Sequence, residues 1–333
     1  MSLSFPLLSK YTSLLAQNKN LLAFSAGVDS SALFFLLLEN NIPFDIALIN
    51  YGTRENSDKE EIHAQALADK YNLTCHTIKA PKFTSHFEKH AREFRYTFFE
   101  TLIKEHGYDT LLTAHQLNDQ LEWLLMRLSK GAGTSELIGL EPESPRNSYT
   151  LIRPLLAYSK EELLSYLQSN DHPYFVDESN SDEKYERNKF RKQFSDPLIA
   201  AYKEGIKRSF DYLRKDKESL EKEFKTLYSQ KELRVVKLYK ASAKTKAADL
   251  ALKELDYLLS ASQRQEIKKE ESLVIGGKWA VETQNDILYI TPYNTVDMPK
   301  AFKEKCRVLK VPSKIRAYCF KENINPSFLI PHS

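Results

Sequence analysis

Residues 25–30 lie between two apolar stretches of the chain and contain four residues that can bind a phosphate or its magnesium ion. A turn at Gly27 that joins a strand to a helix would direct backbone N–H groups and the positive end of the helix dipole at an anion. The hydroxyls of Ser25 and Ser30 add donors, and the carboxylate of Asp29 is a ligand that Mg²⁺ prefers. A strand-to-helix turn that Ser and Asp cap, without any ligand, would explain the same residues. The phosphate hypothesis assigns six consecutive residues to nucleotide binding: Ser25, Ala26, Gly27, Val28, Asp29 and Ser30.

A second polar cluster begins at His115, directly after a predicted strand. On a helix, His115, Asp119 and Glu122 would follow i, i+4, i+7 and share one face, with leucines on another face. Open α/β sheets bind ligands at the carboxyl ends of their strands, so this polar face would line a cleft. The cluster offers His115 and Asp119 as candidate catalytic groups and, with Asp29, carboxylates for a metal, although one histidine and two carboxylates at these spacings fit many helices. The alternative is a helix cap with surface carboxylates.

A third segment carries two arginines on one predicted helix face. Glu88, Arg92 and Arg95 again follow i, i+4, i+7, and aromatic residues form a separate apolar stripe. Two guanidinium groups on one face suit a phosphate or a developing negative charge, which makes Arg92 and Arg95 candidate catalytic residues. An internal ion pair with Glu88 is the alternative.

These clusters need a sheet to position them, and the hydrophobic pattern of residues 20–115 predicts one. Short apolar runs alternate with amphipathic stretches, which is typical of strand-helix-strand units with a parallel sheet. Strands are expected at 21–25, 44–51, 73–78 and 109–114, and helices at 30–40, 57–71 and 85–106. The result is a doubly wound α/β domain with the phosphate loop after its first strand. Residues 131–153 predict a long loop, and residues 159–169 a further helix.

The rest of the chain predicts a linker and a smaller domain. A charged helical pattern at 197–230 gives way to mixed strands and helices. The domains are therefore expected at 1–200 for the catalytic unit, 201–230 for a helical linker and 231–333 for an α+β domain. Within the last of these, Gly276-Gly277 predicts a hairpin between 273–275 and 278–282, followed by a strand at 287–290.

The composition excludes a membrane-spanning protein and a disulfide-rich secreted protein. The apolar stretches are far shorter than the roughly 20 residues of a membrane helix, and residues 1–10 show no signal-peptide pattern. Cys75, Cys306 and Cys319 are widely spaced, form no CxxC pair and fit reduced thiols in the cytoplasm. The net charge of +3 permits an RNA partner without requiring one.

The phosphate loop does not match the GxxxxGK[ST] pattern, because it lacks the lysine. It resembles SGGxDS, the pyrophosphate-binding loop of the N-type ATP pyrophosphatases of the PP-loop superfamily, which cleave ATP between the α and β phosphates to adenylate a substrate. Five more segments extend the resemblance: EKHAREFRY, AHQLNDQLE, MRLSKGAGTSELIGL, RPLL and DESNSDEKYERNKFR. They cover most of residues 20–200 in order, and together they resemble the tRNA(Ile)-lysidine synthetases.

The resemblance implies an ATP-dependent ligase of the cytoplasm. It would adenylate the wobble cytidine of tRNA(Ile) with a CAU anticodon and join L-lysine to it, releasing AMP and pyrophosphate, with ATP and Mg²⁺ as cofactors. The C-terminal domain would recognise tRNA. In the last segment the resemblance implies tRNA contacts for Asn180, Arg187, Asn188 and Arg191. The two arginines lie one helical turn apart, and their alternative partners are Glu183 and Glu186.

Two residues depart from the family pattern. Ala26 replaces a glycine, which would restrict φ or crowd the phosphate. Asn118 replaces the first aspartate of the family's HxxDD motif. Its amide cannot supply a charge to Mg²⁺, which leaves Asp119 as the essential carboxylate. A tRNA thiolase of the same superfamily is the nearest alternative enzyme, and a non-catalytic tRNA-binding protein is the alternative from another class. A homodimer also stays open.

Overall fold

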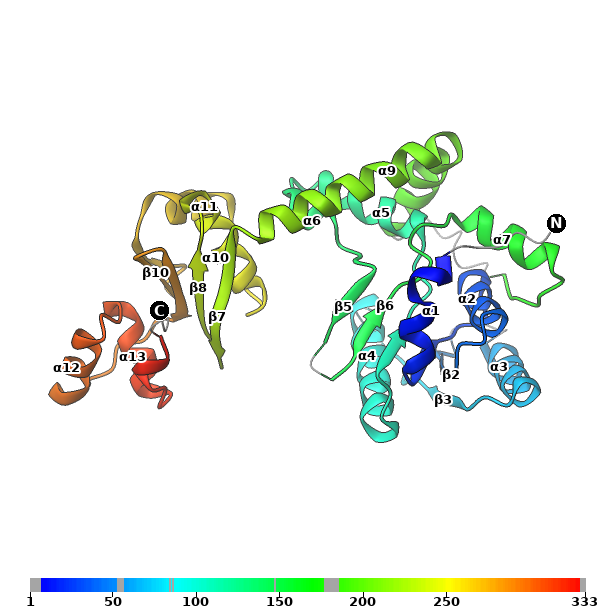
Figure 1. Ribbon diagram of the computed structural model, residues 1–333, viewed down its shortest axis with the longest axis horizontal. Coiled ribbons are helices and arrows are strands. Elements are labelled where there is room, and N and C mark those ends of the chain that lie inside the picture. Colours follow the sequence, from blue (N-terminus) through cyan, green and yellow to red (C-terminus); the bar gives the residue numbers. More distant parts are fainter. Residues whose placement is uncertain are drawn as a thin grey trace. The chain divides into compact units, whose positions relative to one another are not determined.

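The computed structural model describes residues 7–52, 57–83, 85, 87–146, 148–176 and 186–329. Contacts divide the chain into two compact units, Met1–Leu213 and Arg214–Ser333. Each unit has its own sheet and its own hydrophobic core (Figure 1). Within the described ranges, no helix is long and apolar enough to cross a membrane.

The first unit is built on a six-stranded sheet in the order β3-β2-β1-β4-β6-β5. Its strands are β1 (Asn20–Ala23), β2 (Phe44–Asn50), β3 (Cys75–Lys79), β4 (Thr110–Leu112), β5 (Glu143–Pro145) and β6 (Thr150–Ile152). All neighbours are parallel except β5 and β6. The chain passes from β1 outward to β3 and then returns to β4 on the other side of β1, so the strand order reverses between β1 and β4. The predicted doubly wound parallel sheet is confirmed.

Helices cover both faces of this sheet. They are α1 (Leu7–Gln17), α2 (Val28–Glu39), α3 (Ser57–Tyr71), α4 (Phe87–His106) and α7 (Lys160–Ser169). Helix α5 (Leu117–Leu128) packs instead against residues 199–210. Side chains alternate along a strand, and accordingly Leu22 of β1 packs in the core with α2, α3 and α7, whereas Leu21 packs with α4. Burial on both faces explains why the strands appear in the sequence as continuous apolar runs.

The long loop predicted for residues 131–153 is wrong in part. This stretch contains the short helix α6 (Thr134–Leu137) and the strands β5 and β6. Each of the two strands has only three residues, which is too short to leave an alternating pattern in the sequence. Pro145 lies in the edge strand β5, where a missing N–H is tolerated.

The second unit is an antiparallel five-stranded sheet in the order β7-β8-β11-β10-β9. Its elements are β7 (Phe224–Gln230), β8 (Leu233–Leu238), α10 (Lys244–Lys253), α11 (Ala261–Lys269), β9 (Ser272–Ile275), β10 (Trp279–Gln284), β11 (Ile287–Pro292), α12 (Lys300–Val308) and α13 (Ser313–Lys321). One face of the sheet packs against α10 and α11, and the other against α12 and α13. Gly276 and Gly277 both have positive φ between β9 and β10, as the predicted hairpin requires.

The predicted helical stretch before this unit ends earlier than expected. A short helix α8 (Glu186–Phe190) and a π-helical turn at Arg191–Ser195 lead into α9 (Asp196–Glu221). Residues 224–230, which were expected to be helical, form β7 instead. That strand lies at a sheet edge and has no fully buried residue, so its sequence lacks the alternation that marks a half-buried strand.

Candidate active site

The predicted phosphate loop and the second polar cluster meet at the carboxyl edge of the parallel sheet. Residues 25–30 connect β1 to α2, and residues 113–116 follow β4, which is the neighbour of β1. Residues 25–30 and residues 113–116 therefore both lie at the point where the strand order reverses, which is the usual ligand position in doubly wound sheets. Gly27 is the N-cap of α2 and has no side-chain capping bond, so the helix leaves its first N–H groups for an anion.

The hydroxyls of Ser25 and Ser30 contact each other across the loop. Their oxygen atoms lie 3.1 Å apart, and the backbone N–H of Ser25 donates to the Ser30 hydroxyl at 3.2 Å. The Ser30 hydroxyl in turn donates to the carbonyl of Gly27 at 3.2 Å. These bonds close the loop at the N-terminus of α2 and hold both hydroxyls beside it, where a phosphate could replace the contact between them.

Ala26 adopts the left-handed backbone conformation that favours glycine, with φ of +57°. An alanine there carries about 1 kcal/mol of strain. The restriction of φ that the sequence predicts is therefore present. Crowding of the phosphate by the methyl group is not, because the Ala26 side chain is fully buried in the core. Its carbonyl accepts a hydrogen bond from the N–H of Phe175 at 2.8 Å, which holds the loop in place.

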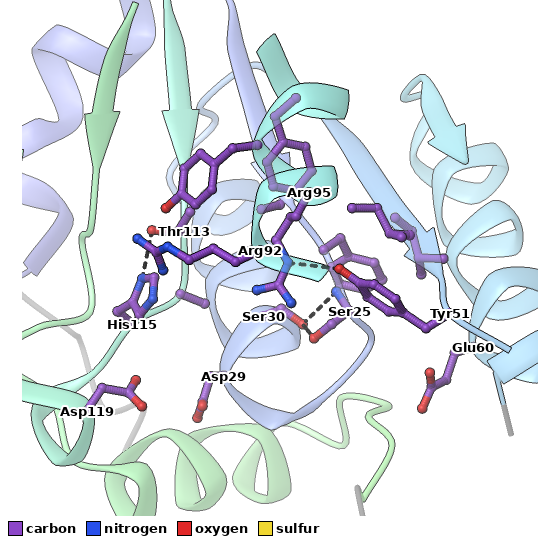
Figure 2. A pocket seen from close by; sticks show the side chains of 17 residues that line it. Ser25, Asp29, Ser30, Tyr51, Glu60, Arg92, Arg95, Thr113, His115 and Asp119 are labelled. Carbon is purple, nitrogen blue, oxygen red and sulfur yellow. Dashed lines mark hydrogen bonds between the residues drawn. The ribbon is translucent and has the colours of Figure 1, made fainter. Parts of the chain in front are cut away.

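A cavity of about 340 Å³ opens beside this loop and brings the three predicted clusters together (Figure 2). Its polar lining residues are Ser25, Asp29, Ser30, Tyr51, Glu60, Arg92, Arg95, Tyr96, Thr113, His115 and Asp119. Apolar residues of β2 and α4, among them Leu48 and Phe99, form another part of the lining. A concave site with an apolar wall and a few converging polar groups is typical of small-ligand binding.

Asp29 and Asp119 form an electrostatically unfavourable pair in this cavity. The Oδ1 atom of Asp29 is buried and has no hydrogen-bond partner in the described part of the chain. Burial and, to a lesser degree, the charge of Asp119 together raise the pKa of Asp29 to about 7, while Lys160 and Arg191 oppose the increase. A bound cation would remove this penalty, because it would compensate the negative charge of both carboxylates.

The donor set fits Mg²⁺ better than a softer metal. Asp29 and Asp119 supply oxygen atoms, and Mg²⁺ in phosphate-transfer sites is usually held by one or two carboxylates together with phosphate oxygens and water. Among the residues that the structure describes, no group of three or more His, Cys, Asp and Glu side chains could hold a metal ion. The protein would therefore supply two ligands and leave the remaining positions to substrate and solvent.

His115 does not lie on the helix, contrary to the prediction. Helix α5 begins at Leu117, and Gln116 is its N-cap: the Gln116 side chain accepts a bond from Asn118 N–H, and Asp119 accepts one from Gln116 N–H at 3.0 Å. This capping box fixes Asp119. The i, i+4 relationship thus fails, although His115 and Asp119 still line the same cavity.

The imidazole of His115 is neutral at physiological pH. Burial, with smaller contributions from the charges of Arg153, Arg187 and Arg92, lowers its pKa to about 4, against the opposing charge of Asp119. Its Nδ1 atom lies 3.0 Å from the hydroxyl of Thr113. A buried neutral imidazole can exchange hydrogen bonds with a substrate without adding charge to the site.

Arg92 and Arg95 both extend from α4 into the cavity, as their helical spacing predicts (Figure 2). Nε of Arg95 donates to the hydroxyl of Tyr51 at 3.1 Å, and the guanidinium of Arg92 lies 5.0 Å from the centre of the Tyr96 ring. Neither arginine forms an ion pair with a described carboxylate. The side chain of Glu88, the alternative partner, lies outside the described residues. Two guanidinium groups without a described counter-ion make this side of the cavity attractive to phosphate.

Arg187 and Arg191 pair with carboxylates of α5. Their Nη2 atoms both lie 3.1 Å from Oδ1 of Asp119. Nε of each donates to the carboxylate of Glu122, at 3.0 Å in the case of Arg191. Burial alone would raise the pKa of Asp119, but His115 and the two arginines hold it below its usual value.

The sequence placed Glu122 in the polar cluster but did not identify it as the ion-pair partner of Arg187 and Arg191. It is almost fully buried, and burial raises its pKa while the two arginines oppose the increase. Asn188 lies on α8 between the arginines. Asn180 and Glu183, as well as the side chain of Glu186, lie outside the described residues. The tRNA contacts of Asn180, Arg187, Asn188 and Arg191 stay predictions.

Asn118, the departure from HxxDD, acts as a connector between helices. It is buried, its Nδ2 donates to Oδ1 of Asp196 at 2.6 Å, and its Oδ1 accepts a bond from the backbone N–H of Lys160 at 3.2 Å. The side chain thereby joins α5 to α7 and α9. Its inability to bind Mg²⁺ is consistent with this position, because both ends of the amide are already engaged.

Two further residues of the site were missed. Tyr51 directly follows β2, so its place at the carboxyl end of a strand was the available signal. Lys160 follows the N-cap Ser159 of α7 and lies against the phosphate loop. No local pattern marks it, because the contact depends on how α7 packs against α2.

Comparison with known proteins finds one domain family in the first unit and relatives that match most of the chain. A family model described as a PP-loop domain matches residues 6–198. The tRNA(Ile)-lysidine synthase of Campylobacter jejuni is 46% identical over 318 residues, which are 95% of this chain and 97% of that protein. The tRNA(Ile)-lysidine synthase of Wolinella succinogenes is 43% identical, covering 93% and 95%, and that of Helicobacter pylori strain 26695 is 43% identical, covering 92% and 91%.

Among solved structures, the U34-tRNA thiolase NcsA from Methanococcus maripaludis resembles the chain with a TM-score of 0.50. The match covers 63% of this chain and 79% of the thiolase, at 18% sequence identity. At this identity the likeness concerns the fold alone.

Proposed function

The chain belongs to the tRNA(Ile)-lysidine synthase family and contains its PP-loop domain, and on that basis we propose a role for each residue around the loop in the reaction of this ATP-dependent tRNA-modifying ligase. One observation carries the proposal. Asp29 and Asp119, from the first turns of α2 and α5 at the strand-order reversal, lie in one cavity with Arg92 and Arg95 and the open N-terminus of α2. This combination suits a magnesium–nucleotide complex and not an uncharged ligand.

The reaction has two displacements. The O2 atom of the wobble cytidine in a CAU anticodon attacks the α-phosphorus of ATP, and the bond from that phosphorus to the bridging oxygen breaks, so pyrophosphate leaves with the electron pair. The side-chain amine of L-lysine then attacks C2 of the activated base, the C2–O bond breaks, and AMP leaves. The phosphoryl transfer is driven by positioning and charge stabilisation rather than by covalent chemistry of the protein.

The charges of the site match the first displacement. The loop N–H groups and the hydroxyls of Ser25 and Ser30 would bind the phosphates that leave, and Arg92 and Arg95 would stabilise the charge on the transferring phosphoryl group. Asp29 and Asp119 would hold Mg²⁺, which neutralises phosphate charge when bound. The unpartnered Asp29 Oδ1 supports this assignment.

The second displacement needs a proton acceptor, because an ammonium group cannot attack. His115 is neutral and Asp119 is ionised, and the two lie in one cavity and interact electrostatically. We assign proton acceptance to this pair, in which the carboxylate stabilises the imidazolium that forms. Asp29 is less suited to the role, since its electrostatic neighbours are Asp119, Lys160 and Arg191 and do not include His115.

The tRNA would be recognised next to this cavity and in the second unit. Arg187 is the more exposed of the two paired arginines, with 47% of its side chain accessible against 17% for Arg191. An incoming phosphate can therefore compete for Arg187 at a lower desolvation cost. Residues 1–200, 201–230 and 231–333 stay our proposed catalytic domain, linker and tRNA-recognition domain.

The thiolase alternative lacks support from the cysteines. Cys75 lies in β3 of the first unit, whereas Cys306 and Cys319 are buried in the core of the second unit, and none of them lines the cavity. A location in the cytoplasm follows from the proposed tRNA substrate. A homodimer stays a prediction, which light scattering of the full-length chain would test.

Pyrophosphate release tests the loop assignment. Full-length protein with tRNA(Ile), ATP, Mg²⁺ and lysine should release pyrophosphate, and Ser25→Ala and Asp29→Ala should reduce the rate by about 100-fold or more. Lys104→Met, at an exposed position of α4 away from the cavity, is the matched control and should behave as wild type. Normal release by both loop variants would count against the assignment.

A further inference from the structure

A second cavity of about 310 Å³ adjoins the phosphate loop. It shares Ser25, Asp29 and Ser30 with the first cavity, and it is also lined by the N-terminus of α2 at Gly27 and Val28. Its other walls come from α7 and from residues 174–176. The loop thus borders two cavities, only one of which contains the arginines of α4.

Among the described residues that line this second cavity, Lys160 is the basic one. Its side chain is half-buried and forms no ion pair with a carboxylate of the described residues, although its charge lowers the pKa of Asp29. Asp29 also lines this cavity, and Lys160 together with the open N-terminus of α2 supplies the positive charge that offsets its carboxylate and attracts an anion. Such a cavity favours an anion with several phosphate oxygens.

The position of Lys160 is fixed by its surroundings. Ser159 and Glu162 form a capping box at the start of α7, and the backbone N–H of Lys160 donates to Asn118. Glu162 pairs with Lys203 at 2.8 Å and with Lys207 at 3.5 Å, so its charge is already compensated. The ammonium group of Lys160 therefore starts from a rigid anchor and stays available to a ligand.

The far wall of the cavity is tied to the loop itself. The N–H of Phe175 donates to the carbonyl of Ala26 at 2.8 Å, and Gly27 forms an isolated parallel bridge with Phe175. Loop, helix α7 and residues 174–176 therefore form one connected wall. The cavity is a built part of the site and shares its walls with the nucleotide loop.

We infer that Lys160 is a further catalytic residue, whose ammonium group binds the pyrophosphate portion of ATP in this second cavity. The inference rests on the proposed nucleotide site. When the bond between the α-phosphorus and the bridging oxygen breaks, the electron pair stays on the leaving pyrophosphate, and Lys160 neutralises the charge that develops there. The loop itself lacks a lysine, and α7 supplies one. Asn118 acts as a positioning residue, since it holds the backbone of Lys160.

Steady-state pyrophosphate release and pyrophosphate binding test the inference together. The variants are Lys160→Met, which keeps the length and removes the charge, and Lys160→Arg, which keeps the charge, with Lys104→Met as the control. In Lys160→Met we expect kcat/KM for ATP to fall by about 10- to 100-fold, and inhibition by added inorganic pyrophosphate with Mg²⁺ to weaken by a similar factor. Lys160→Arg should retain most of both, and tRNA binding and thermal unfolding should match wild type throughout.

Two outcomes separate this inference from the proposed function. If wild type releases pyrophosphate and the loop variants do not, but Lys160→Met shows unchanged kcat/KM and unchanged pyrophosphate inhibition, the role of Lys160 is overturned and the proposed function stands. If wild type releases no pyrophosphate, calorimetric titration of magnesium pyrophosphate into the full-length protein still decides the site. Weaker binding to Lys160→Met than to wild type supports it, and equal binding overturns it.

Discussion

Nδ2 of Asn118 donates a hydrogen bond to Oδ1 of Asp196 at 2.6 Å, between α5 and the start of α9. Asn118 is buried and Asp196 is half-buried, so the bond is shielded from water. An aspartate at position 118, as the HxxDD pattern would have it, would place two carboxylates against each other. The asparagine is thus matched to Asp196 in this chain.

Asn118→Asp should therefore destabilise the protein by about 2–4 kcal/mol at pH 8, because a charge-assisted hydrogen bond becomes a like-charge contact. The contact raises the folded-state pKa of one carboxyl group above its unfolded value. The penalty is then present in full above the folded pKa and disappears as the pH falls below the unfolded pKa. Urea unfolding at pH 8 and pH 5 measures it. The double variant Asn118→Asp/Asp196→Asn restores one donor and should recover most of the loss, and an equally unstable double variant would contradict the pairing.

Asp29 should make stability depend on pH between about 4 and 7 in the absence of metal. Its folded pKa of about 7 lies above the unfolded value near 4, so the folded state binds the proton more tightly. Stability from this group is present below the unfolded pKa and is lost as the pH rises through 7. Asp29→Asn lacks this loss and should be more stable than wild type at pH 8 by about 1–2 kcal/mol, with no gain at pH 4. Chemical unfolding in EDTA checks this, and an equal gain at both pH values would rule out the titration of Asp29.

Magnesium and ATP should make wild type more stable than Asp29→Asn at pH 8. A cation bound between the carboxylates stabilises wild type and not Asp29→Asn, since it binds only the folded state. Thermal unfolding with and without magnesium ATP measures the shift. An identical shift in the variant would remove Asp29 from the metal site.

Arg187 and Arg191 should separate into two roles. Arg187→Ala should weaken tRNA binding and reduce the slope of log affinity against log salt by about 0.7–0.9, the loss of one phosphate contact. Arg191→Ala should mainly lower stability, by about 2–3 kcal/mol, because it is the more buried partner of Glu122. Filter binding over a salt series and urea unfolding measure the two effects. An unchanged salt slope in Arg187→Ala would restrict that arginine to the ion-pair network.

A chain that ends at Glu221 should fold and bind ATP but act poorly on tRNA. The first unit has its own sheet and core, and α9 ends at that residue. The catalytic groups all lie in this unit, whereas contacts outside the anticodon add affinity and position the base. Circular dichroism, ATP binding and tRNA binding of the truncated chain test this. Full tRNA affinity in the folded truncation would contradict the division.

The strands and loops around the site were predictable because their signals are local. Each signal spans only a few residues: the apolar run that ends before Ser25, the turn at Gly27, and the three-residue spacing of Arg92 and Arg95. The hairpin at Gly276 and Gly277 was predictable for the same reason, since two consecutive glycines with positive φ serve a tight turn.

The remaining features depend on an uncommon helix cap and on contacts between distant segments. Helix α5 begins after His115 because Gln116 and Asp119 cap it, a combination less common than Ser or Thr at the N-cap. The pairing of Arg187 and Arg191 with Glu122 joins residues more than 60 positions apart. Packing of α7 against α2 brings Lys160 to the loop. No periodicity in the sequence encodes these three contacts.

The central claim is tested most directly by the balance of products in one reaction. Full-length protein is incubated with a tRNA(Ile) transcript bearing a CAU anticodon, ATP, Mg²⁺ and labelled lysine, and the digested tRNA is analysed by mass spectrometry. A transcript with a UAU anticodon is the matched control. The account predicts one AMP and one pyrophosphate for each lysine incorporated, with the added mass on the wobble cytidine and none in the control. Formation of ADP and phosphate, or a wobble cytidine without lysine while pyrophosphate is released, would contradict it.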